Sequence, residues 1–123
     1  DINVMLRNAR AFNANQLTDI RILTGNFIMV ESQVGYVVYA HAQTGSIRIA
    51  VGDRVVPGQH LANVGHSGNS TAPHLHFHIM DRSDPWTAQG IACAFQDYEV
   101  FQDGAWRPVQ QGIPKASERI RKL

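Results

Sequence analysis

Residues 74–79 alternate strictly between histidine and large apolar side chains, reading His-Leu-His-Phe-His-Ile. Successive side chains of a strand point to opposite faces, so the run predicts a strand with Leu75, Phe77 and Ile79 on its buried face. The opposite face then carries three imidazoles. Neutral imidazole is the commonest metal ligand in proteins, and its pKa suits proton transfer. A half-exposed strand with a histidine-rich polar face accounts for the pattern equally well.

Composition narrows the class of protein. The chain has 123 residues, 44% of them hydrophobic and 17% charged, which suits one globular domain with a core of its own. The net charge of +1 and the lack of a basic run argue against nucleic acid as a partner. The apolar runs are too short to span a membrane, and no signal peptide opens the chain. Cys93 is the single cysteine, so no internal disulfide forms.

Short runs of β-forming residues recur along the chain between turns centred on glycine. This spacing predicts an all-β fold, mainly an antiparallel β-sandwich. We expect strands at residues 2–7, 26–31, 36–41, 47–51, 61–64 and 74–79, and loops at 10–19 and 81–90. Residues 98–101 and 106–109 predict a hairpin with an Asp-Gly turn. Residues 117–123 predict a short terminal helix with Ser117 as its N-cap.

Four motifs between residues 25 and 80 occur in the order typical of one family. Gly-Asn opens residues 25–30, and Gly-Tyr followed by Tyr-Ala-His spans 35–41. Val-Gly-Asp-x-Val-x-x-Gly-Gln spans 51–59. Residues 65–77 match Gly-x-Ser/Thr-Gly-x-Ser-Thr-Gly-Pro-His-Leu-His-Phe, with Ala72 where glycine is usual. With these motifs the chain resembles the lysostaphin-like (LytM-type) zinc peptidoglycan endopeptidases.

The resemblance implies a zinc metalloendopeptidase that cuts peptides of the bacterial cell wall outside the cytoplasm. It assigns His76 as a zinc ligand and His41 and His74 as unligated catalytic histidines. It also implies a LytM-like β-sandwich, related to the barrel-sandwich hybrid. We therefore expect a peptidase core at residues 1–80 and a C-terminal extension at 81–123 that packs on it.

One part of the family's metal site has no counterpart in this sequence. The other two zinc ligands of the family come from a His-x-x-x-Asp motif, but the first histidine here is His41. Asp1 could be the last residue of that motif. We prefer to align residues 1–6 with the family's later Asp-Gly-x-Val strand, with Ile2 in place of glycine. The missing ligands then lie upstream of Asp1, the alternative we favour, or this member has lost them.

Other polar residues are weaker candidates. His78 is expected beside the site, as a neighbour of the ligands or a wall of the groove, with direct ligation a minority alternative. His66 and His60 are expected to be solvated. Tyr39 should share a strand face with His41, so it is a candidate groove residue, although packing is as good an explanation. The spacing of three aspartates does not point to zinc: Asp81, Asp84 and Asp97.

Two other classes of protein share features with this sequence. Biotinyl and lipoyl carrier domains share the turn at residues 51–59, but they need a modified lysine in an exposed hairpin. The only lysines here, Lys115 and Lys122, lie near the C-terminus, so a carrier role fails. The second alternative is a catalytically degenerate LytM-type domain that binds the cell wall or regulates a partner. The missing His-x-x-x-Asp favours it, and the presence of His41, His74 and His76 argues against it.

Overall fold

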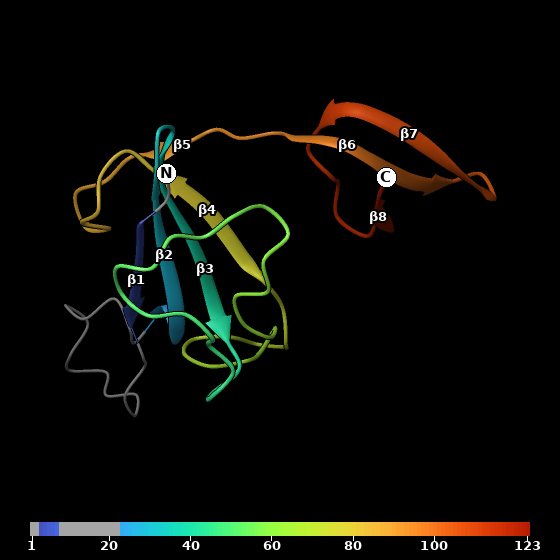
Figure 1. Cartoon of the computed structure of the whole chain (residues 1–123). Coiled ribbons are helices and arrows are strands. Elements are labelled where there is room, and N and C mark those ends of the chain that lie inside the picture. Colours follow the sequence, from blue (N-terminus) through green and yellow to red (C-terminus); the bar gives the residue numbers. More distant parts are fainter. Residues whose placement is uncertain (1–2, 8–22) are drawn as a thin grey trace. The chain divides into compact units, whose positions relative to one another are not determined.

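The structure is a computed structural model that describes residues 3–7 and 23–123. Its two compact units, Asp1–Ile91 and Ala92–Leu123, are treated separately below. Every strand pair in the described residues is antiparallel, in one sheet of five strands and another of three (Figure 1). The all-β, mainly antiparallel fold predicted from the sequence is confirmed.

The first unit is built on a sheet with strand order β1-β2-β3-β4-β5. The strands are β1 (Asn3–Arg7), β2 (Asn26–Ser32), β3 (Gly35–Ala42), β4 (His76–Met80) and β5 (Gly90–Ile91). Short runs of β-forming residues correctly predicted the first four strands, although the one expected at residues 74–79 begins at His76. The predicted loop at residues 10–19 lies outside the described residues.

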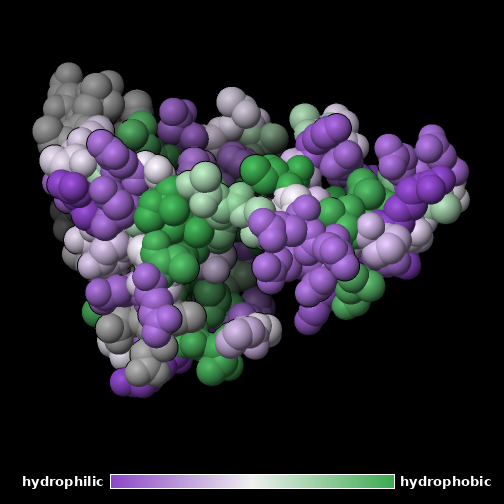
Figure 2. All heavy atoms as spheres, turned by 90° about the horizontal axis from the view of Figure 1, so that it is seen from above, coloured by the Kyte–Doolittle hydropathy of each residue, from purple (hydrophilic) through white to green (hydrophobic). Residues whose placement is uncertain are grey.

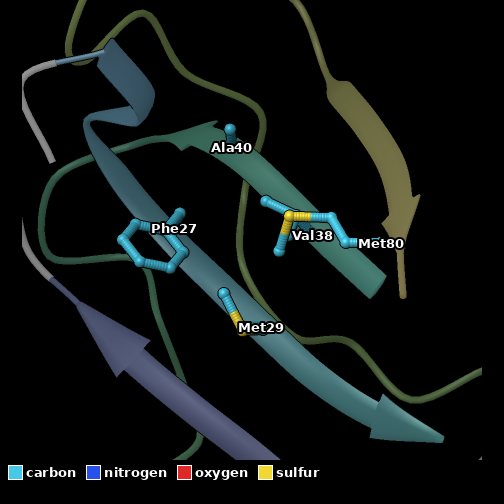
Figure 3. Close-up of a cluster of buried hydrophobic side chains, with 5 residues drawn as sticks. All are labelled: Phe27, Met29, Val38, Ala40 and Met80. Carbon is cyan, nitrogen blue, oxygen red and sulfur yellow. The ribbon is translucent and has the colours of Figure 1, made fainter. Parts of the chain in front are cut away.

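The two faces of this sheet carry different apolar clusters. On one face, β2 and β3 contribute the cluster drawn in Figure 3, which β4 completes: Phe27, Met29, Val38, Ala40 and Met80. On the other face, Ile28 and Val30 pack with Ile49 and with partly buried residues of the segment 47–62. Cross-strand partners of an antiparallel pair share a face. Because His76 pairs with Ala40 and His78 with Val38, both histidines lie on the Figure 3 face.

The segment between β3 and β4 corrects two predictions. Residues 47–51 and 61–64 were expected to be strands, but they form irregular chain with isolated bridges only. Side chains of this segment accept hydrogen bonds from backbone N–H groups that strand pairing would otherwise use. The Asp53 carboxylate accepts from the Ala50 N–H at 2.8 Å, and the Ser46 hydroxyl accepts from the Asn63 N–H at 3.0 Å. Such local bonds compete with strand pairing.

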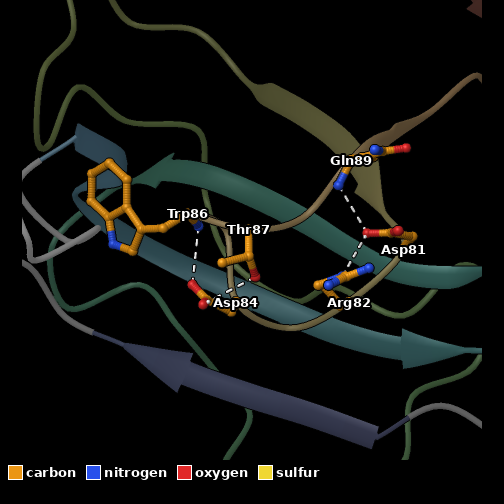
Figure 4. A network of polar contacts seen from close by, with 6 residues as sticks. All are labelled: Asp81, Arg82, Asp84, Trp86, Thr87 and Gln89. Atoms are coloured by element: carbon orange, nitrogen blue, oxygen red, sulfur yellow. Dashed lines mark hydrogen bonds and ion pairs between the residues drawn. The ribbon is translucent and has the colours of Figure 1, made fainter.

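The loop after β4 is held by two aspartates (Figure 4). Asp84 accepts from the Trp86 N–H at 3.0 Å and from the Thr87 hydroxyl at 3.1 Å. Asp81 accepts from the Gln89 N–H at 2.8 Å, and this bond lowers the pKa of its carboxyl group. This loop brings Ala88 onto the apolar cluster of Figure 3.

The second unit is a three-stranded sheet with order β7-β6-β8. The hairpin of β6 (Phe95–Gln102) and β7 (Ala105–Gly112) confirms the one predicted around the Asp-Gly turn. The predicted terminal helix is wrong. Instead β8 (Ile120–Lys122) pairs with β6, and Ser117, expected as an N-cap, has a φ of 68°. A helix of seven residues has too few internal hydrogen bonds to be stable alone, whereas the edge of β6 offers ladder partners.

Arginines cover the aromatic side chains of the second unit. The Arg121 guanidinium lies 4.3 Å from the Trp106 ring centroid, and that of Arg119 lies 5.1 Å from the Phe101 centroid. Arg121 also pairs with the Glu99 carboxylate. Cation–π contacts of this kind hold a small sheet together with few buried residues.

Apolar side chains are exposed among hydrophilic ones in both units (Figure 2). In the described part of the chain, no helix combines the length and the hydropathy of a membrane span. The packing of residues 81–123 on the core stays a prediction.

Candidate metal centre

A β-bulge in β3 determines on which face His41 lies. Asn26 pairs with Ala42 and Ile28 pairs with Tyr39, so the single residue Phe27 of β2 faces two residues of β3. The second of these, His41, has a φ of 62°. Bulges re-aim side chains and often lie next to active sites. Regular alternation would have put His41 on the face of Tyr39, opposite His76.

After the bulge, His41 lies with two other histidines. Its ring centroid is 4.7 Å from that of His74 and 5.6 Å from that of His76. His41 is buried, while His74 and His76 are exposed. The sequence-based choice of these three residues therefore identifies one spatial cluster, which we call the histidine cluster.

Backbone carbonyls fix the protons of two of these rings. The Nδ1 atom of His41 lies 2.8 Å from the Ser67 carbonyl oxygen, and Nδ1 of His74 lies 2.7 Å from that of Ala72. A carbonyl oxygen only accepts, so Nδ1 carries the proton in both rings. Each Nε2 atom then has a free lone pair, which can bind a metal or accept a proton.

His76 has its partner on the same strand. Its Nε2 atom lies 2.8 Å from Nδ1 of His78, with the ring centroids 5.0 Å apart. This contact leaves Nδ1 of His76 for a metal, provided Nε2 donates the hydrogen bond. Ligating histidines almost always donate their other N–H to a neighbour, which fixes the ring and makes it more basic. The geometry agrees with the expectation that His78 lies beside the ligand and not on the metal.

The donor set of the histidine cluster suits a borderline metal such as zinc. One ring nitrogen from each histidine lies within 4.8 Å of the other two. Zn–N bonds of about 2.0–2.1 Å put two nitrogens on one tetrahedral zinc roughly 3.4 Å apart. The cluster is loose enough for one of its members to bind the metal while the others stay unligated.

Burial and neighbouring histidines favour the neutral forms of His76 and His78. Partial desolvation lowers the pKa of the His76 imidazole, and the neighbouring His78, His41 and His74 lower it further. Desolvation also lowers the pKa of His78. A metal binds the neutral form of imidazole. The lowered pKa of His76 therefore favours the form of this ring that binds a metal ion at neutral pH.

Other candidates lie outside the cluster. His60 bonds to the Asn63 side chain at 2.8 Å, and His66 bonds to the Ser70 hydroxyl at 2.8 Å. Tyr39 packs against Phe77 on the opposite face, with ring centroids 5.4 Å apart, because the bulge separates it from His41. Its expected place beside His41 is therefore wrong. Among the described residues, no carboxylate joins the histidine cluster, which leaves out Asp81, Asp84 and Asp97.

Two features that shape the cluster could not be predicted from strand periodicity. The bulge leaves no periodic signal, because β-forming residues run through it without a break. Ser67 was noted only as part of a motif, yet its carbonyl oxygen bonds His41. The close spacing of Gly65, Ser67 and Gly68 was the signal available.

Three histidines gather at one antiparallel β-sheet, two of them bonded to carbonyl oxygens and the third to another histidine, and together they form a candidate metal site of the kind that metallohydrolases use. Comparison with known families makes this assignment specific. The family model of peptidase family M23 matches residues 10–88, more than half of the chain. The chain belongs to peptidase family M23, a family of metal-dependent peptidases that act on peptidoglycan. No curated protein and no solved structure matches it.

Proposed function

We propose that this chain is a zinc metalloendopeptidase domain that hydrolyses peptides of bacterial peptidoglycan outside the cytoplasm. The observation that carries the proposal is the histidine cluster, in a chain of family M23. His76 would bind zinc through Nδ1. His41 and His74 would act on the reacting atoms through Nε2, since their Nδ1 atoms are held by carbonyl oxygens. When bound, zinc would polarise the scissile carbonyl and make a water molecule more acidic.

His74 is the better base of the two catalytic histidines because it is exposed, whereas His41 is buried. As the water oxygen attacks the carbonyl carbon, Nε2 of His74 takes a water proton. The imidazolium then has two N–H groups, and Nδ1–H still donates to the Ala72 carbonyl. As the C–N bond breaks, Nε2–H returns that proton to the leaving amine.

His41 is suited to orient the attacking water. Its ring is buried, and its Nδ1–H donates to a carbonyl oxygen, so the ring orientation is fixed. With the proton on Nδ1, Nε2 has a lone pair that accepts a hydrogen bond from a water molecule without reorganising during the reaction. His41 would thus orient the water while His74 moves the proton.

Single substitutions separate the proposed roles. His76→Ala should abolish zinc binding, measured by calorimetry. His74→Ala should keep zinc binding but lower turnover of a cell-wall peptide by roughly 10²–10⁴-fold, the usual contribution of an acid/base group. The measurements should use this chain together with any preceding residues of its parent protein, which supply the remaining ligands if they lie upstream of Asp1.

The matched control is His60→Ala, which removes an exposed loop histidine that bonds to the Asn63 side chain and is not part of the histidine cluster. Zinc affinity and turnover should both stay at the level of the unaltered protein. Full activity in both His76→Ala and His74→Ala would rule out the proposed mechanism.

One observation supports a second candidate function. The described residues provide no carboxylate at the cluster, and the sequence has no His-x-x-x-Asp motif. A degenerate domain that binds peptidoglycan or a regulated partner fits this. Retention on isolated cell walls without release of peptide, in the presence of zinc, would favour this second function over hydrolysis.

A further inference from the structure

The bulge at His41 opens a gap in the β2–β3 ladder, and a side chain from a distant loop fills it. The Asn26 N–H donates to the Ser67 hydroxyl at 3.0 Å, and that hydroxyl donates to the Ala42 carbonyl oxygen at 2.8 Å. Asn26 and Ala42 are paired residues of β2 and β3. The Ser67 hydroxyl therefore bridges the two strands at the pair next to the bulge.

The same residue also contacts the re-aimed histidine. The Ser67 carbonyl oxygen accepts from Nδ1 of His41 at 2.8 Å. Ser67 thus touches the bulge with its hydroxyl and the imidazole with its backbone. Half-buried Ser67 thus provides hydrogen-bond partners for both strands and for the imidazole ring, as buried polar groups require. We call Ser67 with these three bonds the anchor.

Close packing keeps this anchor in place. A Cβ atom on Gly25 would overlap the Ser67 backbone, and one on Gly68 would overlap the backbone of Gly25. The next residue, Asn69, donates its N–H to the Leu23 carbonyl at 3.1 Å. The loop therefore lies directly on the start of β2, with Ser67 packed against Gly25.

We propose that Ser67 is the positioning residue that holds His41 in the histidine cluster. Its hydroxyl keeps the bulge closed on β2, and its carbonyl keeps the proton on Nδ1 and so directs the lone pair of Nε2 to the cluster. The catalytic meaning of that position rests on the proposed function, but the positioning itself does not. It is measurable in the metal-free chain without any turnover.

The test is a long-range ¹H–¹⁵N NMR spectrum of the histidine rings at about pH 8, where free imidazole is neutral. In the unaltered chain, His41 should be a single tautomer with its proton on Nδ1. In Ser67→Ala the His41 ring nitrogens should shift toward tautomer-averaged values. Ser67→Thr keeps a hydroxyl and should restore the single tautomer.

Ser46→Ala is the matched control. The Ser46 hydroxyl also donates to a carbonyl, that of Gln43 at 2.7 Å, and accepts an N–H, that of Asn63 at 3.0 Å. It has no contact with the histidine cluster, so the His41 signals should stay unchanged. An equal change in Ser46→Ala and Ser67→Ala would overturn the proposal, as would a folded Ser67→Ala with an unchanged His41 ring.

The unaltered chain provides a second measurement in case Ser67→Ala does not fold. The Asn26 amide should exchange with solvent slowly, because the Ser67 hydroxyl accepts its proton. An Asn26 amide that exchanges as fast as an unstructured one, or a His41 ring with its proton on Nε2, would overturn the proposal. Loss of peptide hydrolysis with intact His41 signals would instead count against the proposed function alone.

Discussion

Proton positions on the imidazoles decide what the histidine cluster can bind. His41 and His74 are held as Nδ1–H tautomers by carbonyl oxygens. His76 depends on a side chain, that of His78. A backbone carbonyl is still present after most substitutions of its residue, whereas any substitution of His78 removes the imidazole that contacts His76. The ring proposed to bind zinc is therefore the most easily disturbed of the three.

Removing His78 should weaken zinc binding without removing a ligand. Loss of a hydrogen-bond partner behind a ligand typically lowers metal affinity by about 10–100-fold. We expect a decrease of that size in His78→Ala, measured by competition with a chromogenic chelator. The control His66→Ala alters an exposed histidine that bonds to Ser70. An unchanged zinc affinity in His78→Ala would show that His76 does not need this partner.

The metal-free chain should lose stability as the pH falls from about 7.5 to about 5. The pKa values of His76 and His78 lie below the ordinary 6.5 in the folded state, so the unfolded chain binds more protons in this range. The free energy of unfolding then decreases as the pH drops below the unfolded value, until the folded rings also protonate. Urea denaturation across this range measures it.

The variant for this measurement is the double substitution of His76 and His78 by Gln, which should flatten the pH dependence. The range avoids the Asp81 carboxyl, whose lowered pKa contributes stability that is lost only near and below its ordinary 3.8. An unchanged slope in the double variant would assign the pH dependence to other groups.

At the scale of elements, the contact between the start of β2 and the Ser67 loop determines the shape of the site. Gly25 has a φ of 64°, and a Cβ there would meet the Ser67 backbone. Gly58 also has a positive φ, 84°, but no atom lies within 4 Å of its would-be Cβ. The two glycines share a positive φ, which would strain any L-residue placed there, and differ in the space around a would-be Cβ atom.

Gly25→Ala should therefore destabilise the fold far more than Gly58→Ala. A left-handed conformation costs an L-residue about 1–2 kcal/mol, which both variants incur. Overpacking adds about 1–3 kcal/mol in Gly25→Ala alone. Thermal or urea unfolding measures the difference. Equal decreases in the free energy of unfolding of the two variants would show that the Ser67 loop moves to accommodate the new Cβ atom at no energetic cost.

The positions of the strands could be predicted from the sequence, since Asn26–Ser32 runs apolar and His76–Met80 alternates. Their burial could not: Asn26–Ser32 is buried on both faces over most of its length, and Leu75, expected on a buried face, is 54% exposed. The segment 47–64 could not, because polar side chains take over its backbone donors. The three residues of the histidine cluster were chosen through motifs. Their convergence depends on a bulge that involves long-range contacts to Ser67, which strand periodicity cannot reveal.

On the scale of the whole molecule, the chain combines a unit of residues 1–91 with a much smaller one of residues 92–123. In the smaller unit the buried hydrophobic residues are Tyr98 and Val100. Segments below about 40 residues usually need a disulfide, a metal or a partner to fold. This unit has Cys93 as its single cysteine, so no internal disulfide supports it.

A peptide of residues 92–123 should thus be largely unfolded on its own. Circular dichroism of the peptide should lack a cooperative thermal transition, whereas the full chain should keep the slow amide exchange of β6. This outcome would agree with the predicted packing of the extension on the core. A cooperative transition in the isolated peptide would show that its aromatic and arginine contacts suffice.

The bulge in β3 also makes the chain sensitive to its own length. Inserting one residue between Phe27 and Ile28, the length of one codon, would give Ala40 and His41 one partner each and return the strand pair to regular alternation. His41 would then lie on the Tyr39 face of the sheet, away from His76, although no histidine had been replaced. A gene that keeps every histidine but adds one residue there would encode a sheet without the site.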